Sequence, residues 1–93
     1  QRLTAAAVLG VSGKPQRVYG FSMRAAAAGP GTVNLLNGTD STGTEHHSVT
    51  GVEDGVIGVD FGTNGKFFPA GCYVVLDTNV TYADFNYEQV QST

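Results

Sequence analysis

Apolar and polar residues alternate with a period of two in several short segments of this chain. The clearest segment spans residues 17–24, where aromatic and aliphatic side chains occupy every second position. Successive side chains of a β-strand point to opposite faces, so this alternation predicts strands with one buried face. Segments 32–36 and 56–61 follow the same pattern. The residues expected to face the core are Tyr19, Phe21, Met23, Val33, Leu35, Ile57, Val59 and Phe61.

The segment 67–88 predicts a β-hairpin, because two runs rich in aromatic and β-branched residues flank the turn-forming sequence Asp77-Thr78-Asn79. The second run has an irregular phase. Val80 and Tyr82 lie one position out of step with the aromatic residues that follow, so an unbroken strand cannot bury all of them. We expect Val80 to belong to the turn and Tyr82 to face outward. The alternative is a bulge near Ala83-Asp84 that shifts the phase.

These segments and the turns between them indicate an all-β fold. Gly, Asn and Pro separate seven or eight short strands, and the alanine run 25–28 leads directly into the turn signal Gly29-Pro30-Gly31. We therefore expect a single compact antiparallel β-sandwich, immunoglobulin-like or jelly-roll-like, without significant helix; a small barrel is the alternative. Residues 1–16 are expected to form an N-terminal strand or an extended arm, and residues 17–93 the β-sandwich domain.

Charge is scarce and unevenly distributed. Charged residues make up 14% of the 93 residues, compared with about 25% in typical soluble proteins. Four of the five basic residues lie in the first 24 positions, and all eight acidic residues come later. Chance could produce this split in so short a chain. The alternative is that the basic N-terminal segment, with Arg2, Lys14 and Arg17, contacts an acidic neighbour such as another copy of the chain.

The candidate chemistry argues against an enzyme, a metal site and a cofactor. Cys72 is the only cysteine, so no intramolecular disulfide exists, and we expect its thiol to be buried. Adjacent strand residues point to opposite faces, so His46 and His47 are not expected to bind one metal ion; we expect them at the surface or at a subunit contact. No nucleophile motif such as G-x-S-x-G is present. The pI of about 5.0 argues against nucleic acid, and the apolar runs are too short to predict a membrane span.

Three parts of the chain between residues 17 and 88 carry a resemblance to a known group of proteins. They are Val18-Tyr19-Gly20-Phe21-Ser22-Met23, then Gly31-Thr32-Val33-Asn34-Leu35-Leu36-Asn37-Gly38-Thr39, and then Phe68-Pro69-Ala70-Gly71-Cys72-Tyr73-Val74-Val75-Leu76 with the closing run Phe85-Asn86-Tyr87-Glu88. Together they resemble small β-sandwich proteins of tailed bacteriophage virions, of the capsid-decoration (cement) or head-accessory type. The chain departs from that group at Ala70, where the group often has Asn or Lys, and at Cys72, which replaces Leu. These motifs are structural, so no contact residue carries over from them.

The resemblance implies a structural, non-enzymatic function on the exterior of the virion. The protein would bind the outer surface of a phage capsid and stabilise it across capsomer junctions. Its partners would be the major capsid protein and neighbouring copies of this chain, with an oligomer forming on the assembled particle. From the charge and histidine patterns, the candidate partner-binding residues are Arg2, Lys14, Arg17, His46 and His47.

A second class of function is a carbohydrate- or receptor-binding module of a tail fibre or a secreted protein. Sugar-binding surfaces combine aromatic side chains with carboxylates or amides. Tyr82, Asp84 and Asn86 alternate along one predicted strand and would form such a surface if they faced solvent. A third possibility is an accessory domain of a longer chain.

Overall fold

Nine β-strands form the regular structure in the computed structural model, which describes residues 1–90. These residues contain no helix, so the expected all-β fold is confirmed. The number of strands exceeds the expected seven or eight because the N-terminal segment contributes two short ones. The strands are β1 (Arg2–Leu3), β2 (Ala7–Val8), β3 (Gln16–Ala25), β4 (Gly31–Asn37), β5 (Thr44–Gly51), β6 (Val56–Asp60), β7 (Lys66–Phe68), β8 (Cys72–Leu76) and β9 (Val80–Gln89).

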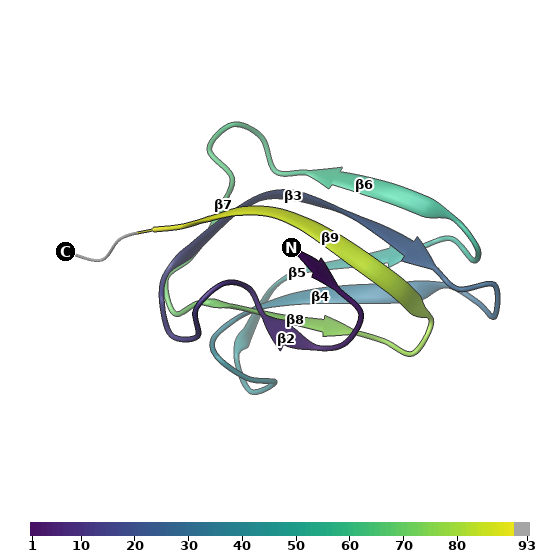
Figure 1. The fold of residues 1–93 in the computed structure, drawn as a ribbon, viewed down its shortest axis with the longest axis horizontal. Helices are drawn as coiled ribbons and strands as arrows, with labels where there is room; N and C mark the ends of the chain where they lie inside the picture. The colour runs from purple at the N-terminus through teal and green to yellow at the C-terminus, as the bar shows by residue number, and fades with distance from the viewer. Residues whose placement is uncertain (91–93) are drawn as a thin grey trace.

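The strands form two antiparallel sheets packed as a sandwich (Figure 1). Sheet A has the order β1-β9-β3-β6, and the short strand β7 also pairs with β3. Sheet B has the order β2-β8-β4-β5. The chain stays within one sheet only from β4 to β5 and from β6 to β7, and every other connection among the described strands crosses between the sheets. The strand orders place β1 and β2 at one edge of the sandwich, and β5 and β6 at the edge on the other side.

The strands β8 and β9 do not pair with each other, so the predicted hairpin is wrong. β8 lies in sheet B between β2 and β4, whereas β9 lies in sheet A between β1 and β3. The connection between them, residues 77–79, therefore passes from one sheet to the other, and its residues are exposed or half-buried. The Asp77 carboxylate holds this connection by accepting hydrogen bonds from the backbone N–H groups of Asn79 at 2.7 Å and Thr32 at 2.9 Å. The alternation of apolar and polar residues predicts that both segments are strands, but it does not show which sheet each strand joins. The two sheets bury their apolar residues in the same core, so strands of either sheet have the same pattern.

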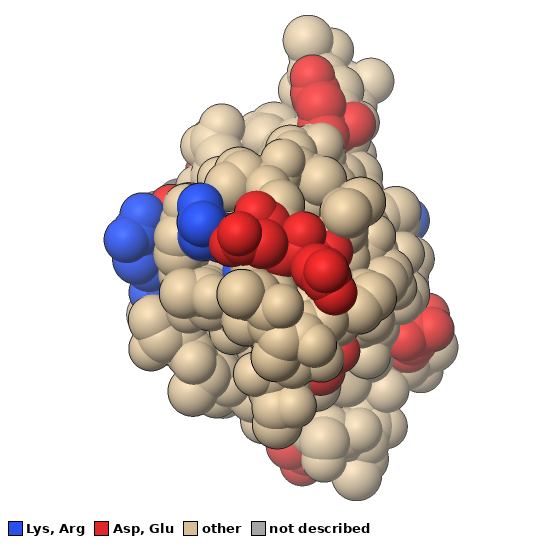
Figure 2. All heavy atoms as spheres, turned by 90° about the vertical axis from the view of Figure 1, so that its right-hand side faces the viewer, with Lys and Arg blue, Asp and Glu red and all other residues tan. Residues whose placement is uncertain are grey.

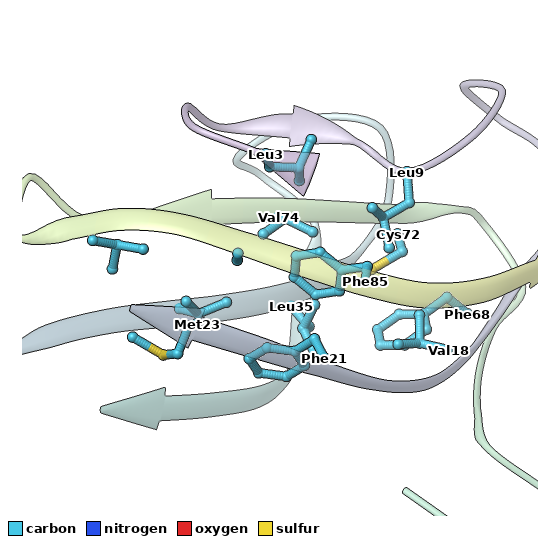
Figure 3. Close-up of a cluster of buried hydrophobic side chains, with 13 residues drawn as sticks. Leu3, Leu9, Val18, Phe21, Met23, Leu35, Phe68, Cys72, Val74 and Phe85 are labelled. Atoms are coloured by element: carbon cyan, nitrogen blue, oxygen red, sulfur yellow. The ribbon is translucent and has the colours of Figure 1, made fainter. Parts of the chain in front are cut away.

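The core lies between the sheets, and the alternating segments together with the segment 67–88 supply most of it (Figure 3). Val33 and Leu35 are fully buried. Phe21 stacks on Phe85 of the neighbouring strand β9, with ring centroids 4.8 Å apart. Burial of one such side chain stabilises the fold by about 1.5–3 kcal/mol. The other residues confirmed at the core are Met23, Ile57, Val59 and Phe61.

Tyr19 is the exception among the expected core residues. The pairing of β3 with β9 shifts register between Val18 and Gly20, so Tyr19 has no partner on β9. This β-bulge reverses the phase of the strand. Val18 is fully buried, whereas Tyr19 is half-buried and lines a groove outside the core. The expectation for Tyr19 is wrong because alternation assumes an unbroken ladder of strand pairs.

A second bulge resolves the irregular phase of β9. Ala25 pairs with Val80 and Arg24 pairs with Tyr82, which leaves Thr81 as the extra residue. Val80 is buried within the strand and does not belong to the turn. Tyr82 lies outside the core, as expected, where the Arg2 guanidinium lies 4.1 Å from the centre of its ring. The bulge therefore exists, but it comes before Tyr82 and not near Ala83-Asp84.

The N-terminal segment lies along the edge of the sandwich and contacts both sheets. β1 pairs with β9, and β2 pairs with β8. Leu3 and Leu9 are buried in the core that the rest of the chain forms. Residues 1–16 were expected to form an N-terminal strand or an extended arm; in the structure they include two short strands that pair with the same two sheets as the rest of the described chain. Residues 91–93 of the expected domain lie outside the described residues.

Candidate functional site

The five candidate residues do not form one cluster in the structure. Arg2 forms an ion pair with Asp84, in which Nε donates to Oδ1 at 2.8 Å and the terminal Nη2 donates to Oδ2 at 2.9 Å. These hydrogen bonds, and the positive charge of Arg2, lower the pKa of Asp84. The guanidinium also stacks over the Tyr82 ring. Arg2 is thus engaged within its own chain, on the outer face of sheet A.

Other basic residues also contact their own chain. Arg17 donates a hydrogen bond of 2.7 Å to the backbone carbonyl of Asn64, and its guanidinium lies 5.2 Å from the centre of the Phe67 ring. Arg24 forms an ion pair of 3.0 Å with Asp54. Basic residues from the first part of the sequence therefore lie next to acidic residues from the later part, which neutralises some of their charge. On the side shown in Figure 2, Lys and Arg side chains lie close to Asp and Glu side chains, and uncharged residues cover most of the surface.

Lys14 lies in the exposed connection between β2 and β3. This connection approaches the β7–β8 loop closely, since a Cβ atom on Gly71 would lie 3.5 Å from the carbonyl oxygen of Lys14. Arg2, Lys14 and Arg17 come from three different parts of the sandwich: Arg2 from β1, Lys14 from the connection between β2 and β3, and Arg17 from β3.

His46 and His47 lie at a bulge in β5 and turn toward sheet A. Leu35 pairs with His47 and the next residue of β4 pairs with Glu45, so His46 is the extra residue. The His46 ring stacks on Phe68 with centroids 5.3 Å apart, and the His47 ring meets Phe61 edge-on at 4.9 Å. The expectation that the two rings point to opposite faces is wrong, because a bulge places two successive side chains against one partner residue.

Burial and the nearby Lys66 lower the pKa of His47. Both causes disfavour the charged imidazolium, the first by removing water and the second by repulsion. Within residues 1–90, no group of three or more His, Cys, Asp or Glu side chains is arranged to hold a metal ion. The two histidines therefore serve here as partners of aromatic rings at the β5–β6 edge.

The outer face of sheet B carries almost no charge. The register aligns its side chains in rows across the sheet: Val8 opposite Tyr73, and Tyr73 opposite Leu36. Further along, Thr32 and Thr50 share a hydrogen bond of 3.0 Å between their hydroxyl groups. We call this surface the neutral face; its residues are Val8, Thr32, Asn34, Leu36, Ser48, Thr50, Tyr73 and Val75.

The neutral face combines an apolar half with a polar half. Tyr73 and Val75 of the central strand β8 are half-buried, and β2 adds Val8 beside them. On the other half, Ser48 donates a hydrogen bond of 2.7 Å to the side-chain oxygen of Asn34. Charged side chains lie next to this face at its two ends: Glu45 pairs with Leu36 at one end, and at the other the Asp77 carboxylate accepts a hydrogen bond from the backbone N–H of Thr32. Such a surface is polar in part, and its own side chains carry no charge that would lose water on contact.

The outer face of sheet A is different, because it holds charged side chains such as Arg2 and Asp84 and a shallow groove of about 670 Å³. Gly20 and Ser22 of β3 lie at the groove with Tyr19, and the flanking strands β6 and β9 contribute polar side chains. A Cβ atom on Gly20 would lie 2.5 Å from the carbonyl oxygen of Val59, so the close approach of β3 and β6 requires glycine here. The polar side chains along the groove are Ser22, Asp60, Thr63, Asp84 and Asn86.

Cys72 is buried, as expected, and burial raises the pKa of its thiol to about 12. A thiol with so high a pKa is not a nucleophile near neutral pH. None of the described residues forms a helix long and apolar enough to cross a membrane. No protein family, curated protein or solved structure matches this chain.

Sequence reasoning did not identify the neutral face or the groove. The outward positions of segment 32–36 and of the run around Tyr73 are visible in the alternation, but their assembly into one surface depends on which strands pair. The groove also depends on the bulge that places Tyr19 outside the core. The one sequence signal for this bulge is Gly20, because glycine within a strand often marks a bulge.

Proposed function

We propose that this protein is a structural virion protein that binds the outer surface of a phage capsid through the neutral face. The observation that carries the proposal is the contrast between the two sheets. Sheet B presents a nearly uncharged surface, whereas the charged side chains such as Arg2 and Asp84 are gathered on sheet A. The resemblance of three segments to capsid-decoration proteins supports the same function.

A neutral contact surface is favourable for docking because no ion must be stripped of water. Charged residues are depleted at the centre of protein interfaces, and tyrosine is enriched there. The half-buried Val8, Tyr73 and Val75 would supply the apolar centre of the contact, beside the buried Leu36. The Ser48–Asn34 and Thr32–Thr50 pairs would contribute hydroxyl and amide groups that already satisfy one another.

Binding to a capsid does not require a strong individual contact. A capsid repeats the same site by symmetry, and contacts between neighbouring copies would add avidity to each of them. The candidate arm is replaced in this proposal: residues 1–9 support the sandwich, and β2 brings Val8 to the contact surface. Lys14 and the loop around it would lie near the end of the sandwich and could reach an adjacent capsomer.

The test adds the purified protein to expanded, undecorated capsids formed by the major capsid protein encoded in the same genome. We expect co-sedimentation and a higher temperature of capsid disruption. Ser48→Lys and Thr50→Lys each place a charge on an exposed position of the neutral face and should weaken binding at least tenfold. Gly58→Lys places the same charge on the outer face of sheet A, where a Cβ atom meets nothing within 4 Å, and should bind normally.

The capsid proposal is overturned if the wild-type protein does not bind, or if it binds without raising the resistance of the capsid to heat. The assignment of the contact face is overturned if Gly58→Lys abolishes binding while Ser48→Lys and Thr50→Lys leave it unchanged. Far-ultraviolet circular dichroism of all three variants checks that each remains folded.

A further inference from the structure

The groove on sheet A has a lining that the capsid contact does not use. It lies on the sheet opposite the neutral face, so it stays open to solvent when the neutral face is covered. The groove is lined by main chain and small side chains at Gly20 and Ser22, with the larger Tyr19, Asp60 and Asn86 around them.

Tyr19 is positioned in the groove by two local features. The bulge between Val18 and Gly20 takes it out of the strand ladder. Gly65, in the β6–β7 loop, then makes room for its ring, since a Cβ atom at Gly65 would lie 3.1 Å from Cδ1 of Tyr19. Gly65 adopts a φ of 64°, a conformation that favours glycine. A ring held against the main chain in this way loses little further freedom when a ligand packs on it.

The polar groups of the groove retain unused hydrogen-bonding capacity. Asp60 Oδ1 accepts a hydrogen bond of 2.7 Å from the backbone N–H of Gly62, which fixes the carboxylate but leaves its second oxygen available. Ser22 and Asn86 direct no side-chain hydrogen bond to any residue within 1–90. Asp84 differs, because both of its oxygens are occupied by Arg2.

We propose that this groove binds a neutral oligosaccharide. The C–H face of a sugar ring would pack on Tyr19, and its hydroxyl groups would donate to Asp60 and exchange hydrogen bonds with Asn86. The Asp60 carboxylate, which forms no ion pair within residues 1–90, repels anionic ligands such as phosphates and acidic sugars. The polar lining disfavours a purely apolar ligand, because it would leave these groups unpaired. The proposal does not rest on capsid binding, and either can fail without the other.

The test uses the full chain on a printed array of neutral and sialylated oligosaccharides, followed by NMR titration with the neutral oligosaccharide that binds best. We expect neutral glycans to bind and the amide signals of Gly20 and Ser22 to shift. Tyr19→Ala and Asn86→Ala should each weaken binding at least tenfold. Phe67→Ala is the matched control, since Phe67 is an exposed aromatic residue of the same sheet that does not line the groove.

The proposal is overturned if no neutral glycan binds, if sialylated glycans bind better than neutral ones, or if Phe67→Ala weakens binding as much as Tyr19→Ala. A titration with a lysine-rich peptide tests the alternative that the groove binds cationic ligands. Binding of that peptide at Gly20 and Ser22, without binding of glycans, would assign the groove to cationic ligands and would likewise overturn the proposal. Thermal unfolding of each variant, monitored by circular dichroism, shows whether a variant that does not bind is still folded.

Discussion

Gln16 is the polar side chain that the core encloses completely. It is fully buried at the start of β3, and neither its amide nitrogen nor its amide oxygen has a hydrogen-bond partner within residues 1–90. Gly10 makes room for it, because a Cβ atom there would lie 2.9 Å from Nε2 of Gln16 and 3.1 Å from the Tyr87 ring. A buried amide without partners costs about 1–3 kcal/mol. Gln16 therefore lowers the stability of this region.

Replacing Gln16 with methionine should raise the free energy of unfolding by about 1 kcal/mol, because it keeps the length of the side chain and removes the unpaired groups. Urea denaturation measures the effect. Gln89→Met is the matched control, since Gln89 pairs with Gln16 on β9 but is exposed, and it should change stability by less than about 0.5 kcal/mol. A loss of stability in Gln16→Met would mean that the amide has a partner, such as bound water.

His47 should make the stability of the protein depend on pH. Burial and Lys66 lower its pKa below the ordinary 6.5, so the unfolded chain binds a proton more readily than the folded one. The resulting stability is present above about pH 6.5 and is lost as the pH falls through the lowered pKa. Asp40 and Asp84 also have lowered pKa values, but their ordinary value of 3.8 places their effect at more acidic pH.

Melting temperatures between about pH 7.5 and pH 5 test this dependence. We expect the wild-type protein to melt at lower temperature at the acidic end, and His47→Gln to show a smaller decrease over the same range. His46→Gln is the companion variant, because it removes the neighbouring ring and retains His47. If His47→Gln and the wild type lose stability in parallel, the pH dependence comes from other groups.

At the scale of elements, the short strands β1 and β2 hold the two sheets together along one edge. They contain few residues, yet Leu3 and Leu9 from this segment enter the core. The backbone N–H of Leu9 also donates to the carbonyl oxygen of Cys72 at 2.9 Å, and the N-terminal amino group donates to the carbonyl oxygen of Phe85 at 2.9 Å. The segment thus contacts both sheets through side chains and main chain.

Leu9→Ala should consequently lower the free energy of unfolding by roughly 2–5 kcal/mol, as expected for a fully buried leucine whose removal leaves a cavity. Val11→Ala, two residues later, changes a side chain that is 54% exposed and should cost less than about 0.5 kcal/mol. Chemical denaturation of both variants provides the comparison. Equal and small effects would show that the N-terminal segment contributes little and can leave the sandwich without unfolding it.

The elements also show how far alternation predicts this fold. The strands containing Val33 and Ile57 follow from the sequence, because a half-buried strand needs apolar residues at every second position. Their partners do not follow, as β8 and β9 demonstrate. Bulges at Tyr19, His46 and Thr81 each move side chains to a different face. A bulge depends on the fit between two strands, and that fit is decided by residues far apart in the chain.

At the scale of the whole molecule, the sandwich has one neutral face and one charged face with a groove. Neither surface could be derived from the sequence, because each gathers residues from several strands whose order was unknown. The alternative of a carbohydrate-binding module placed Asp84 and Asn86 on one polar surface with Tyr82 if all three faced solvent, and Asp84 and Asn86 do line one groove. Tyr82 is occupied by Arg2, however, and the aromatic residue of the groove is Tyr19. The polar residues of the groove could be recognised in the sequence. Their position beside Tyr19 could not, because it depends on the pairing of β3 with β9.

The position of β9 in sheet A has a kinetic consequence. Its neighbours β1 and β3 belong to residues 2–25, whereas β9 comprises residues 80–89, so sheet A cannot be completed until the end of this segment has left the ribosome. Pairings between distant parts of a chain form slowly, because a large loop must close before any contact is gained. The local β4–β5 hairpin of sheet B has no such delay. During synthesis, the backbone edge of β3 that pairs with β9 therefore has no partner until residues 80–89 emerge, and chaperones that shield unpaired strand edges would act in that interval.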